Sequence, residues 1–416
     1  LDFSISQAIK IFFELYAVAP LYIVNILDVE KHKTDNKKTM MAIELKSGKT
    51  VINNHKIITD TLVVKDNATS LPISDAITIW TAEGLEIYAT VAGNNVDIEY
   101  EEVDLSKVTK TEAIGGFDST TMKRTGLELA NEIFLKYSEL PAFIDAPDFS
   151  HESDVAAIME TKAKTLNGGM FEAIALINAP VDKKYNDLVE WKETNNILSN
   201  DQVLLYGKIK LAGEIYHQSI HYAALSMKVD SENNGVPSQG PSNYSYKMDA
   251  FVWKNASGKY EEVRLDKEQQ ANFLNKNGVV TAINFKGWRC WGSETAKNPL
   301  ATDPKDKYIY GRRMFKYIGN ELVISYFNNV DKKFTLKMAE TMKKSMNIRL
   351  NALVAADQLL SAKVNFYSVD NSLIDIINGD ITWTIELGII PGAKSITFKK
   401  VYDVDALQKF TESLTA

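Results

Sequence analysis

The first part of the chain combines a helical pattern with an extended apolar run. Ile9, Phe12 and Tyr16 recur at helical spacing and form one apolar stripe, and a following proline ends the predicted helix. Residues 21–27 (LYIVNIL) then predict a buried strand. We interpret residues 1–30 as the start of the main domain.

Residues 31–119 show a period of two instead. Leu85 and Ile87 would face one side of a strand, while Glu86 and Tyr88 would face the other. Short alternating strands separated by frequent turn residues predict a small, mostly β domain. We expect this stretch to be an insertion into a larger domain.

Helical and strand patterns alternate after the insertion. The sequence predicts helices over 120–139 and 151–166, and strands over 142–146 and 171–178. This order is typical of an α/β layer with crossover connections. We therefore expect residues 120–330 to form an α/β domain together with the N-terminal segment.

The last part of the chain, residues 331–416, predicts a helix, a hairpin and a short terminal helix. Asp331 can cap a helix in which an apolar residue occupies every fourth position, namely Phe334, Met338, Met342 and Met346. Alternation over 381–387 predicts a half-buried strand. After a Pro-Gly turn, residues 394–402 would return as its partner, and 405–414 would form the last helix.

Together these patterns predict a mixed α/β (α+β) fold. The N-terminal segment and the C-terminal two-thirds would form the main domain, with the small β-rich domain inserted between them. The 416 residues are 45% hydrophobic and 24% charged, an ordinary balance for a globular protein. A chain of this length is expected to form roughly two to four domains.

Charge and cysteine content exclude several classes of protein. The net charge of −7 argues against a nucleic-acid-binding protein, which usually carries a basic excess. The single cysteine, Cys290, excludes an internal disulfide framework. The most apolar stretch, residues 5–29, is interrupted by Lys10, Glu14 and Pro20, so we expect no membrane insertion. It also lacks the basic start and the cleavage site of a signal peptide.

The sequence contains few candidates for catalysis. His217 and His221 have the spacing of a helical zinc-binding pair, but Gln218 stands where a metalloprotease has its glutamate. Cys290 follows Arg289, yet no histidine is near it in the sequence, so we expect a packed core residue. Phosphate-binding and nucleophile-elbow motifs are missing. We predict no catalytic residue, no metal site and no cofactor.

One segment carries a more specific signal. From Asn284 the chain reads NFKGWRCWGSETAKN, followed by DPKDKYIYGRRMFKYIGNELVIS. The segment resembles the tail sheath proteins of contractile-tailed phages, of the shorter type found in prophages and phage-tail-like bacteriocins. The likeness continues over 347–367 and the closing DITWTIELGIIPGAKSITFKKVYD. The matching positions are Gly287, Trp288, Trp291, Gly292, Thr295, Arg312 and Arg313.

The resemblance implies a structural subunit and no enzymatic activity. Sheath subunits form six-membered rings that stack helically around an inner tube, and contraction drives the tube through a cell envelope. The implied partners are other copies of the chain, the tail tube protein, and the baseplate and tail-terminator proteins. The implied location is a virion tail assembled in the cytoplasm of the bacterial host.

A basic helix face is the candidate contact with the tube. We measure the angle of each residue around the helix axis from Lys333, at about 100° per residue. Lys337 then lies at about 40° and Lys344 at about 20°. The four apolar positions of the same predicted helix fall between about 100° and 220°. We expect these three lysines to face the tube, although an exposed lysine face is usually only solvated.

Other motif residues have structural roles in this interpretation. The polar face of the predicted hairpin carries Thr382, Thr384 and Glu386, and its backbone edge is a candidate for strand pairing between subunits. A hairpin that pairs only within its own chain is equally compatible with the pattern. We expect the two tryptophans of the motif to pack in the core. The two arginines fit ion pairs within a domain or between subunits.

Two other classes of protein stay open. An unrecognised α/β enzyme would need a pocket with convergent polar groups. A receptor- or carbohydrate-binding tail protein would use the insertion, residues 31–119, as its working part. The sequence also leaves open whether the particle is an infectious phage or a bacteriocin.

Overall fold

The computed structural model describes residues 3–414. The chain divides into two compact units, residues 1–330 and residues 331–416. The first unit has a large core and also contains a β-rich segment with a separate core, whereas the second is built around one long helix and a two-stranded sheet.

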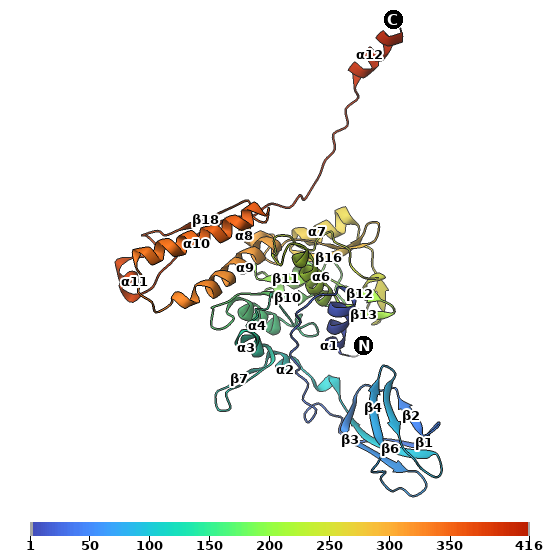
Figure 1. The fold of residues 1–416 in the computed structure, drawn as a ribbon. Coiled ribbons are helices and arrows are strands. Elements are labelled where there is room, and N and C mark those ends of the chain that lie inside the picture. The colour runs from blue at the N-terminus through green and yellow to red at the C-terminus, as the bar shows by residue number, and fades with distance from the viewer. Residues whose placement is uncertain (1–2, 415–416) are drawn as a thin grey trace. The chain divides into compact units, whose positions relative to one another are not determined.

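A five-stranded sheet lies at the centre of the first unit (Figure 1), in the order β17-β16-β11-β10-β9. The strands are β9 (Phe143–Asp145), β10 (Ile174–Asn178), β11 (Gln202–Leu205), β16 (Val279–Asn284) and β17 (Trp288–Trp291). Neighbours from β9 to β16 pair in parallel, and β17 pairs antiparallel with β16. β10 and β11 are buried along their whole length, as expected for strands covered on both faces.

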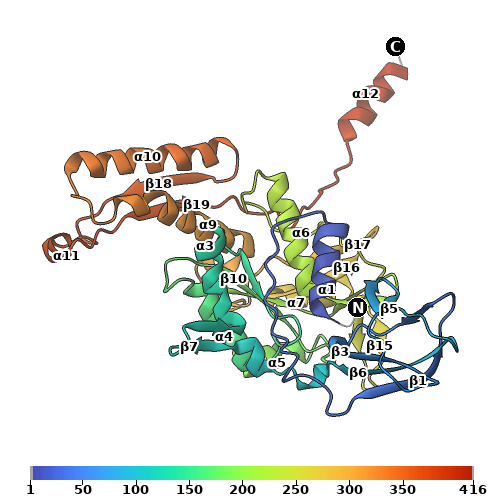
Figure 2. The same ribbon diagram turned by 60° about the horizontal axis from the view of Figure 1, so that its bottom comes forward.

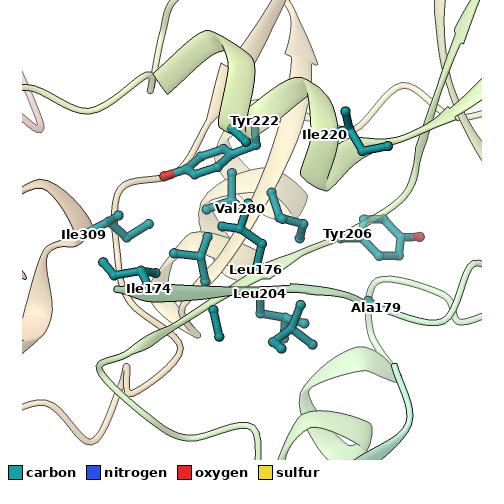
Figure 3. Close-up of a cluster of buried hydrophobic side chains, with 14 of the residues drawn as sticks. Ile174, Leu176, Ala179, Leu204, Tyr206, Ile220, Tyr222, Val280 and Ile309 are labelled. Carbon is teal, nitrogen blue, oxygen red and sulfur yellow. The ribbon is translucent and has the colours of Figure 1, made fainter. Parts of the chain in front are cut away.

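Helices cover this sheet. α4 (Ser153–Lys164) and α6 (Gln218–Glu232) pack against β9 and β10, and α7 (Asn272–Lys276) packs against β16. Figure 3 shows Tyr222 and Ile220 of α6 above the strands that carry Leu176 and Leu204. The remaining helices here are α2 (Lys110–Ile114), α3 (Ala130–Tyr137), α5 (Leu188–Thr194), α8 (Pro304–Lys307) and α9 (Ile309–Tyr326).

A second, antiparallel sheet adjoins the core in the order β13-β12-β14-β15. Its strands are β12 (Lys208–Leu211), β13 (Glu214–His217), β14 (Ala250–Lys254) and β15 (Tyr260–Glu262). β13 leads directly into α6, so the residues at this junction are buried between the sheet and the helix.

The N-terminal helix is confirmed, but the strand predicted after it is wrong. α1 (Ser4–Ile9) continues as a π-helix over Lys10–Leu15, and Phe12 is buried in the core. Residues 21–27 form no strand and none of them is buried. Tyr22 instead contacts the ring of Tyr137 at 5.2 Å between centroids. An apolar run predicts contact with other residues, but it does not supply a strand to pair with.

The predicted helix over 120–139 is correct only in its second half. β7 (Gly116–Asp118) and β8 (Lys123–Thr125) form a hairpin, and a 3₁₀ turn over Gly126–Leu129 leads into α3. Gly126 has φ +57°, and a Cβ there would lie 2.5 Å from the Ala113 carbonyl oxygen. A regular helix therefore cannot continue through Gly126.

The β-rich segment has its own core. Its strands form two three-stranded antiparallel sheets, β1-β6-β3 and β2-β5-β4. Figure 2 shows β3, β6 and β1 of the first sheet side by side. Leu85, Ile87, Val96 and Ile98 are completely buried between them, as their alternation with polar residues predicts. The strands are β1 (Lys38–Glu44), β2 (Lys49–Ile52), β3 (Ile57–Asp66), β4 (Ile77–Thr81), β5 (Gly84–Tyr88) and β6 (Asn95–Glu102).

In the second unit one long helix packs on a two-stranded sheet. β18 and β19 pair antiparallel, and α10 contacts β18. Met346, Leu350 and Leu353 form the buried face of α10. The elements are α10 (Leu336–Ala355), β18 (Ser361–Asn365), α11 (Leu373–Asn378), β19 (Thr384–Gly388) and α12 (Val404–Leu414).

The predicted C-terminal hairpin is wrong. β19 pairs with β18, which precedes it in the sequence, and residues 394–402 are exposed and form no strand. The alternation over 381–387 correctly predicts a strand in this region, but alternation does not specify which segment pairs with it.

With strands and helices alternating in the first unit and a helix on a sheet in the second, the predicted mixed α/β class is confirmed. Among residues 3–414, none of the helices combines the length and apolar character that a bilayer crossing requires.

Candidate subunit interface

The two tryptophans of the sequence motif are fixed inside the first unit. Trp288 is buried, and its indole N–H donates to the Asp249 carbonyl oxygen at 2.9 Å. The Trp291 indole N–H donates to Asn272 Oδ1 at 3.1 Å, and Lys267 Nζ lies 5.4 Å from the Trp291 ring centroid. Both side chains stabilise the first unit.

The small residues of the motif, two glycines and a threonine, lie in the turns beside β17. Gly287 connects β16 to β17 with φ +112°, and Gly292 follows β17 with φ +137°. Thr295 is completely buried, and its hydroxyl donates to the Asp306 carbonyl oxygen at 2.5 Å. The motif therefore fixes the path of the chain from β17 towards α8.

The first arginine of the motif belongs to a buried charge cluster. Asp201, just before β11, is 1% exposed, and its Oδ1 accepts from Arg312 Nε at 2.8 Å. Lys316 Nζ lies 2.5 Å from the same oxygen and also donates to the Ala173 carbonyl oxygen at 2.7 Å. Burial alone would raise the pKa of Asp201, but the hydrogen bond from Arg312 and the charge of Lys316 leave it below the ordinary value.

The second arginine joins α9 to α6. Arg313 forms a two-pronged ion pair with Asp230 of α6, and its guanidinium lies 4.7 Å from the ring centroid of Phe143 in β9. Both motif arginines thus form ion pairs within their own unit.

The two histidines with zinc-site spacing have different partners. His217 Nε2 lies 2.9 Å from Asp148 Oδ1, whereas His221 Nδ1 lies 3.4 Å from the Tyr16 hydroxyl oxygen. Burial lowers the pKa of His221 to about 3, so the ring is neutral at ordinary pH. Among residues 3–414, no group of three or more His, Cys, Asp or Glu side chains is placed to hold a metal ion.

Cys290 is a core residue in the structure. The thiol is completely buried, and burial raises its pKa to about 12. The neighbouring Arg289 side chain donates to the carbonyl oxygens of Phe285 and Asn243. The thiol is therefore protonated at ordinary pH.

The candidate tube contact is only partly helical. α10 begins at Leu336, and Thr335 caps it by accepting from the Met338 amide at 3.2 Å. Lys333 therefore precedes the helix, and the predicted helical start at Asp331 is wrong. Lys337 and Lys344 lie about 160–180° around α10 from the buried Met346, on its exposed face.

The three candidate strand residues lie at β19, but only two of them are in the strand. Thr384 Oγ1 donates to Asp370 Oδ2 at 2.9 Å, and Glu386 accepts from Tyr367 at 2.7 Å. Thr382 precedes β19, and its backbone is held by the Asn371 side chain. Because the sheet has two strands, β18 and β19 each leave one edge unpaired within the described chain.

The segment after β19 exposes large apolar side chains. Residues 389–403 lead in an irregular, extended path to α12 (Figure 1). We call residues 389–414 the C-terminal arm. The exposed fraction is 71% for Ile396, 82% for Phe398 and 72% for Tyr402. Large apolar side chains that lie this close together in the sequence are ordinarily buried against other residues. The arm is therefore the strongest candidate for an interface.

Comparison with known proteins agrees with the sequence motif. No family model matches the chain. The major tail sheath protein of Serratia phage KSP20 is 28% identical over 137 residues, which are 32% of this chain. The matched region spans about a third of the length of that relative (33%).

Solved structures extend the comparison over two-thirds of the chain. A chain of the anti-feeding prophage baseplate superposes with a TM-score of 0.53 at 17% identity, over 67% of this chain and 73% of that one. The contracted sheath complex of PVC, an extracellular contractile injection system, gives 0.53 at 15% identity, over 68% and 76%. The contracted helical sheath of the anti-feeding prophage gives 0.52 at 17% identity, over 67% and 74%. This chain has a contractile-sheath fold.

The resemblance seen in the sequence is therefore confirmed. In this sheath fold, the residues that carry the sequence likeness stabilise the interior of the first unit. The exposed features lie elsewhere, on α10, at the edges of the β18–β19 sheet and along the C-terminal arm. The partner of β19 is β18, and the alternation of Ala362 and Val364 with polar residues is the sequence signal that indicates this strand.

We expect Asp201→Asn to lower the free energy of unfolding by about 3 kcal/mol, because it leaves Lys316 and Arg312 with only the more exposed carboxylate of Glu172 as a counter-charge, at 3.7 Å and 3.6 Å. Urea unfolding measures this free energy. The matched control Glu83→Gln removes a negative charge at an exposed site and should change the free energy of unfolding by less than about 0.5 kcal/mol. Equal effects would contradict the role of the cluster.

The same cluster predicts an acid-dependent stability. Because the folded-state pKa of Asp201 lies below its ordinary 3.8, its stabilisation is present above pH 3.8 and is lost as the pH falls through the folded-state value. Unfolding followed between pH 5 and 2 should be less pH-dependent in Asp201→Asn than in the unaltered chain.

The two motif glycines should differ in their tolerance of a side chain. Both have positive φ, so alanine at either costs about 1–3 kcal/mol of backbone strain. A Cβ at Gly292 would also lie 2.8 Å from Asn275 Oδ1 and 3.0 Å from Val280 Cα, whereas the space around Gly287 is open. Thermal unfolding should therefore show a larger loss for Gly292→Ala than for Gly287→Ala, and the reverse order would contradict this geometry.

Proposed function

We propose that this chain is the structural subunit of a contractile tail sheath. It assembles into stacked six-membered rings around an inner tail tube and contracts to drive the tube through a cell envelope. The observation that carries the proposal is the C-terminal arm, a long apolar segment exposed in a chain with a contractile-sheath fold. Its role is structural and not enzymatic.

The arm has the pattern of a strand that is completed by another subunit. Ile396 and Phe398 are two residues apart and would share one face of a strand, with Thr397 on the other. The unpaired edges of the β18–β19 sheet offer backbone groups to such a strand. Burial of each large apolar side chain contributes about 1.5–3 kcal/mol, which favours association.

The partners follow from this role. They are further copies of the chain, the tail tube protein, and baseplate and terminator proteins at the two ends, in a particle assembled in the bacterial cytoplasm. The three lysines 333, 337 and 344 face the tube. The β-rich insertion, residues 31–119, decorates the outer surface, because insertions are tolerated at exposed sites.

Substitution in the arm tests the proposal. Ile396→Asp combined with Phe398→Asp should leave a folded chain with an unchanged melting temperature but abolish polymers in electron micrographs and sedimentation. The matched control, Lys399→Ala in the same arm, should still assemble. Polymers of normal length from the double variant would contradict the role of the arm.

Charge reversal on α10 tests the tube contact. Lys337→Glu combined with Lys344→Glu should reduce co-sedimentation with purified tube protein at least tenfold, and the binding of the unaltered chain should weaken with salt. Lys343→Glu is the matched control, because Lys343 lies on the flank of the helix, about 60° from Met346. The three-lysine variant that adds Lys333→Glu shows whether the residue before the helix contributes.

Unchanged binding of both variants would contradict the tube contact, without affecting the proposed self-assembly. An enzyme or a receptor-binding protein with this fold would instead remain monodisperse when the intact chain is concentrated.

A further inference from the structure

The beginning of the described chain is held on the core of the first unit. We call residues 4–16 the docked segment. It packs against α6 (Figure 2), and Phe12 and Tyr16 are buried. The Tyr16 hydroxyl accepts from the Lys247 amide at 3.1 Å. Residues 17–30, which follow, form no helix or strand, and an irregular connection of this kind lets a segment open without unfolding the core.

The first turns of the docked segment cover a cluster of charged side chains. Asp148 Oδ1 lies 2.9 Å from Nε2 of His217. The Ser4 side chain forms a hydrogen bond with Asp148, and Gln7 Oε1 accepts from the His217 amide at 3.4 Å. His217 is buried, whereas the Asp148 side chain is 48% exposed. The cluster therefore lies under the docked segment and reaches solvent through Asp148.

A second carboxyl group belongs to the same cluster. Asp145 ends β9, and its Oδ1 is buried without a hydrogen-bond partner among the described residues. The Ser219 side chain forms a hydrogen bond with Asp145, and the Ser219 hydroxyl oxygen accepts from Asn178 Nδ2 at 2.8 Å. Burial raises the pKa of Asp145 to about 7, against the hydrogen bond from Ser219 and with a contribution from the charge of Asp148.

The charged neighbours of the cluster act on the other carboxyl group. Burial alone would raise the pKa of Asp148, but the hydrogen bond with His217 lowers it to about 2, and the charge of Lys208 contributes. Lys208 Nζ of β12 lies 3.5 Å from His217 Nε2, and burial lowers the pKa of both groups. Positive charges on His151 and Lys254 act on this pair as well.

Asp145 has no such support. Among the described residues, the groups that act on its carboxyl include no cation. An ionised Asp145 would therefore place an uncompensated negative charge beside the ionised Asp148, in a site where one of its oxygens has no donor.

We propose that Asp145 is a proton-operated latch for the docked segment. While Asp145 holds its proton, the cluster has one carboxylate, Asp148, and the docked segment remains in place. Loss of the proton adds a second carboxylate, and release of Ser4 and Gln7 then admits water to both. The latch lies within the first unit and does not depend on the proposed sheath function.

The raised pKa of Asp145 gives the direction of the pH dependence. The docked state binds the proton more tightly than the released state, in which the hydrated carboxyl returns towards 3.8. Docking is therefore most favourable at low pH, weakens as the pH rises to about 7, and changes no further above that value. For one proton, the ratio of docked to released molecules changes by up to about tenfold per pH unit.

Hydrogen exchange of the full chain between pH 5 and 8, followed by mass spectrometry, tests the latch. Protection factors correct for the direct effect of pH on the exchange chemistry. Protection of residues 4–16 should fall by up to about tenfold per pH unit until about pH 7, while α4 stays more protected. Asp145→Asn, which resembles the neutral acid, should remove this pH dependence. The matched control Asp182→Asn, at an exposed site of the same unit, should retain it.

Three results would overturn the latch. The first is protection of residues 4–16 that is independent of pH in the unaltered chain, and the second is an equal pH dependence in Asp145→Asn. The third is equal protection of α4 and residues 4–16, which would mean that the segment opens only when the whole unit unfolds.

A second variant keeps the proposal testable if Asp145→Asn does not fold. Asp148→Asn removes the neighbouring negative charge at a half-exposed position, so the pH at which protection stops falling should move to a lower value. An unshifted transition would overturn the latch. None of these measurements involves polymers, so failure of the latch leaves the proposed function standing.

Discussion

The buried carboxylate of Asp201 is the interaction on which the first unit depends. It lies at the start of a central strand and binds two cations of α9, so it fixes the last long helix of the unit to the sheet. A charge buried to this extent is tolerated only when its partners are in place. Arg313 adds a second link from α9 to α6, and the motif around Trp288 fixes the chain that leads into α9. The residues that carry the sequence likeness to tail sheath proteins thus stabilise the interior of the first unit.

The second unit presents the opposite situation. α10 and the β18–β19 sheet bury one small apolar face, but the strand edges and the C-terminal arm remain open. A well-packed first unit combined with exposed apolar segments at the C-terminus is what a self-assembling protein requires. The first unit is packed around its own core, whereas the C-terminal arm leaves its large apolar side chains exposed.

The sequence predicted elements well where burial alone determines them. The alternation of Leu85 and Ile87 and the apolar run in β10 both correspond to buried strands. Prediction failed where a partner distant in sequence decides the structure. Residues 21–27 are apolar but have no strand to pair with, and β19 pairs with β18 instead of the segment that follows it. Phe334 fits the helical period and so predicts an earlier start for α10, but Thr335 caps the helix, which begins at Leu336. The sequence pattern fits ion pairs of the two motif arginines within a domain or between subunits, and the positions of Asp201 and Asp230 place both ion pairs within the first unit.

We propose that the intact chain assembles by itself into a sheath. Negative-stain electron microscopy of the concentrated product of the complete reading frame tests this self-assembly most directly. Hollow, striated tubes are the predicted result. Monodisperse particles that persist after addition of tail tube protein would contradict the claim.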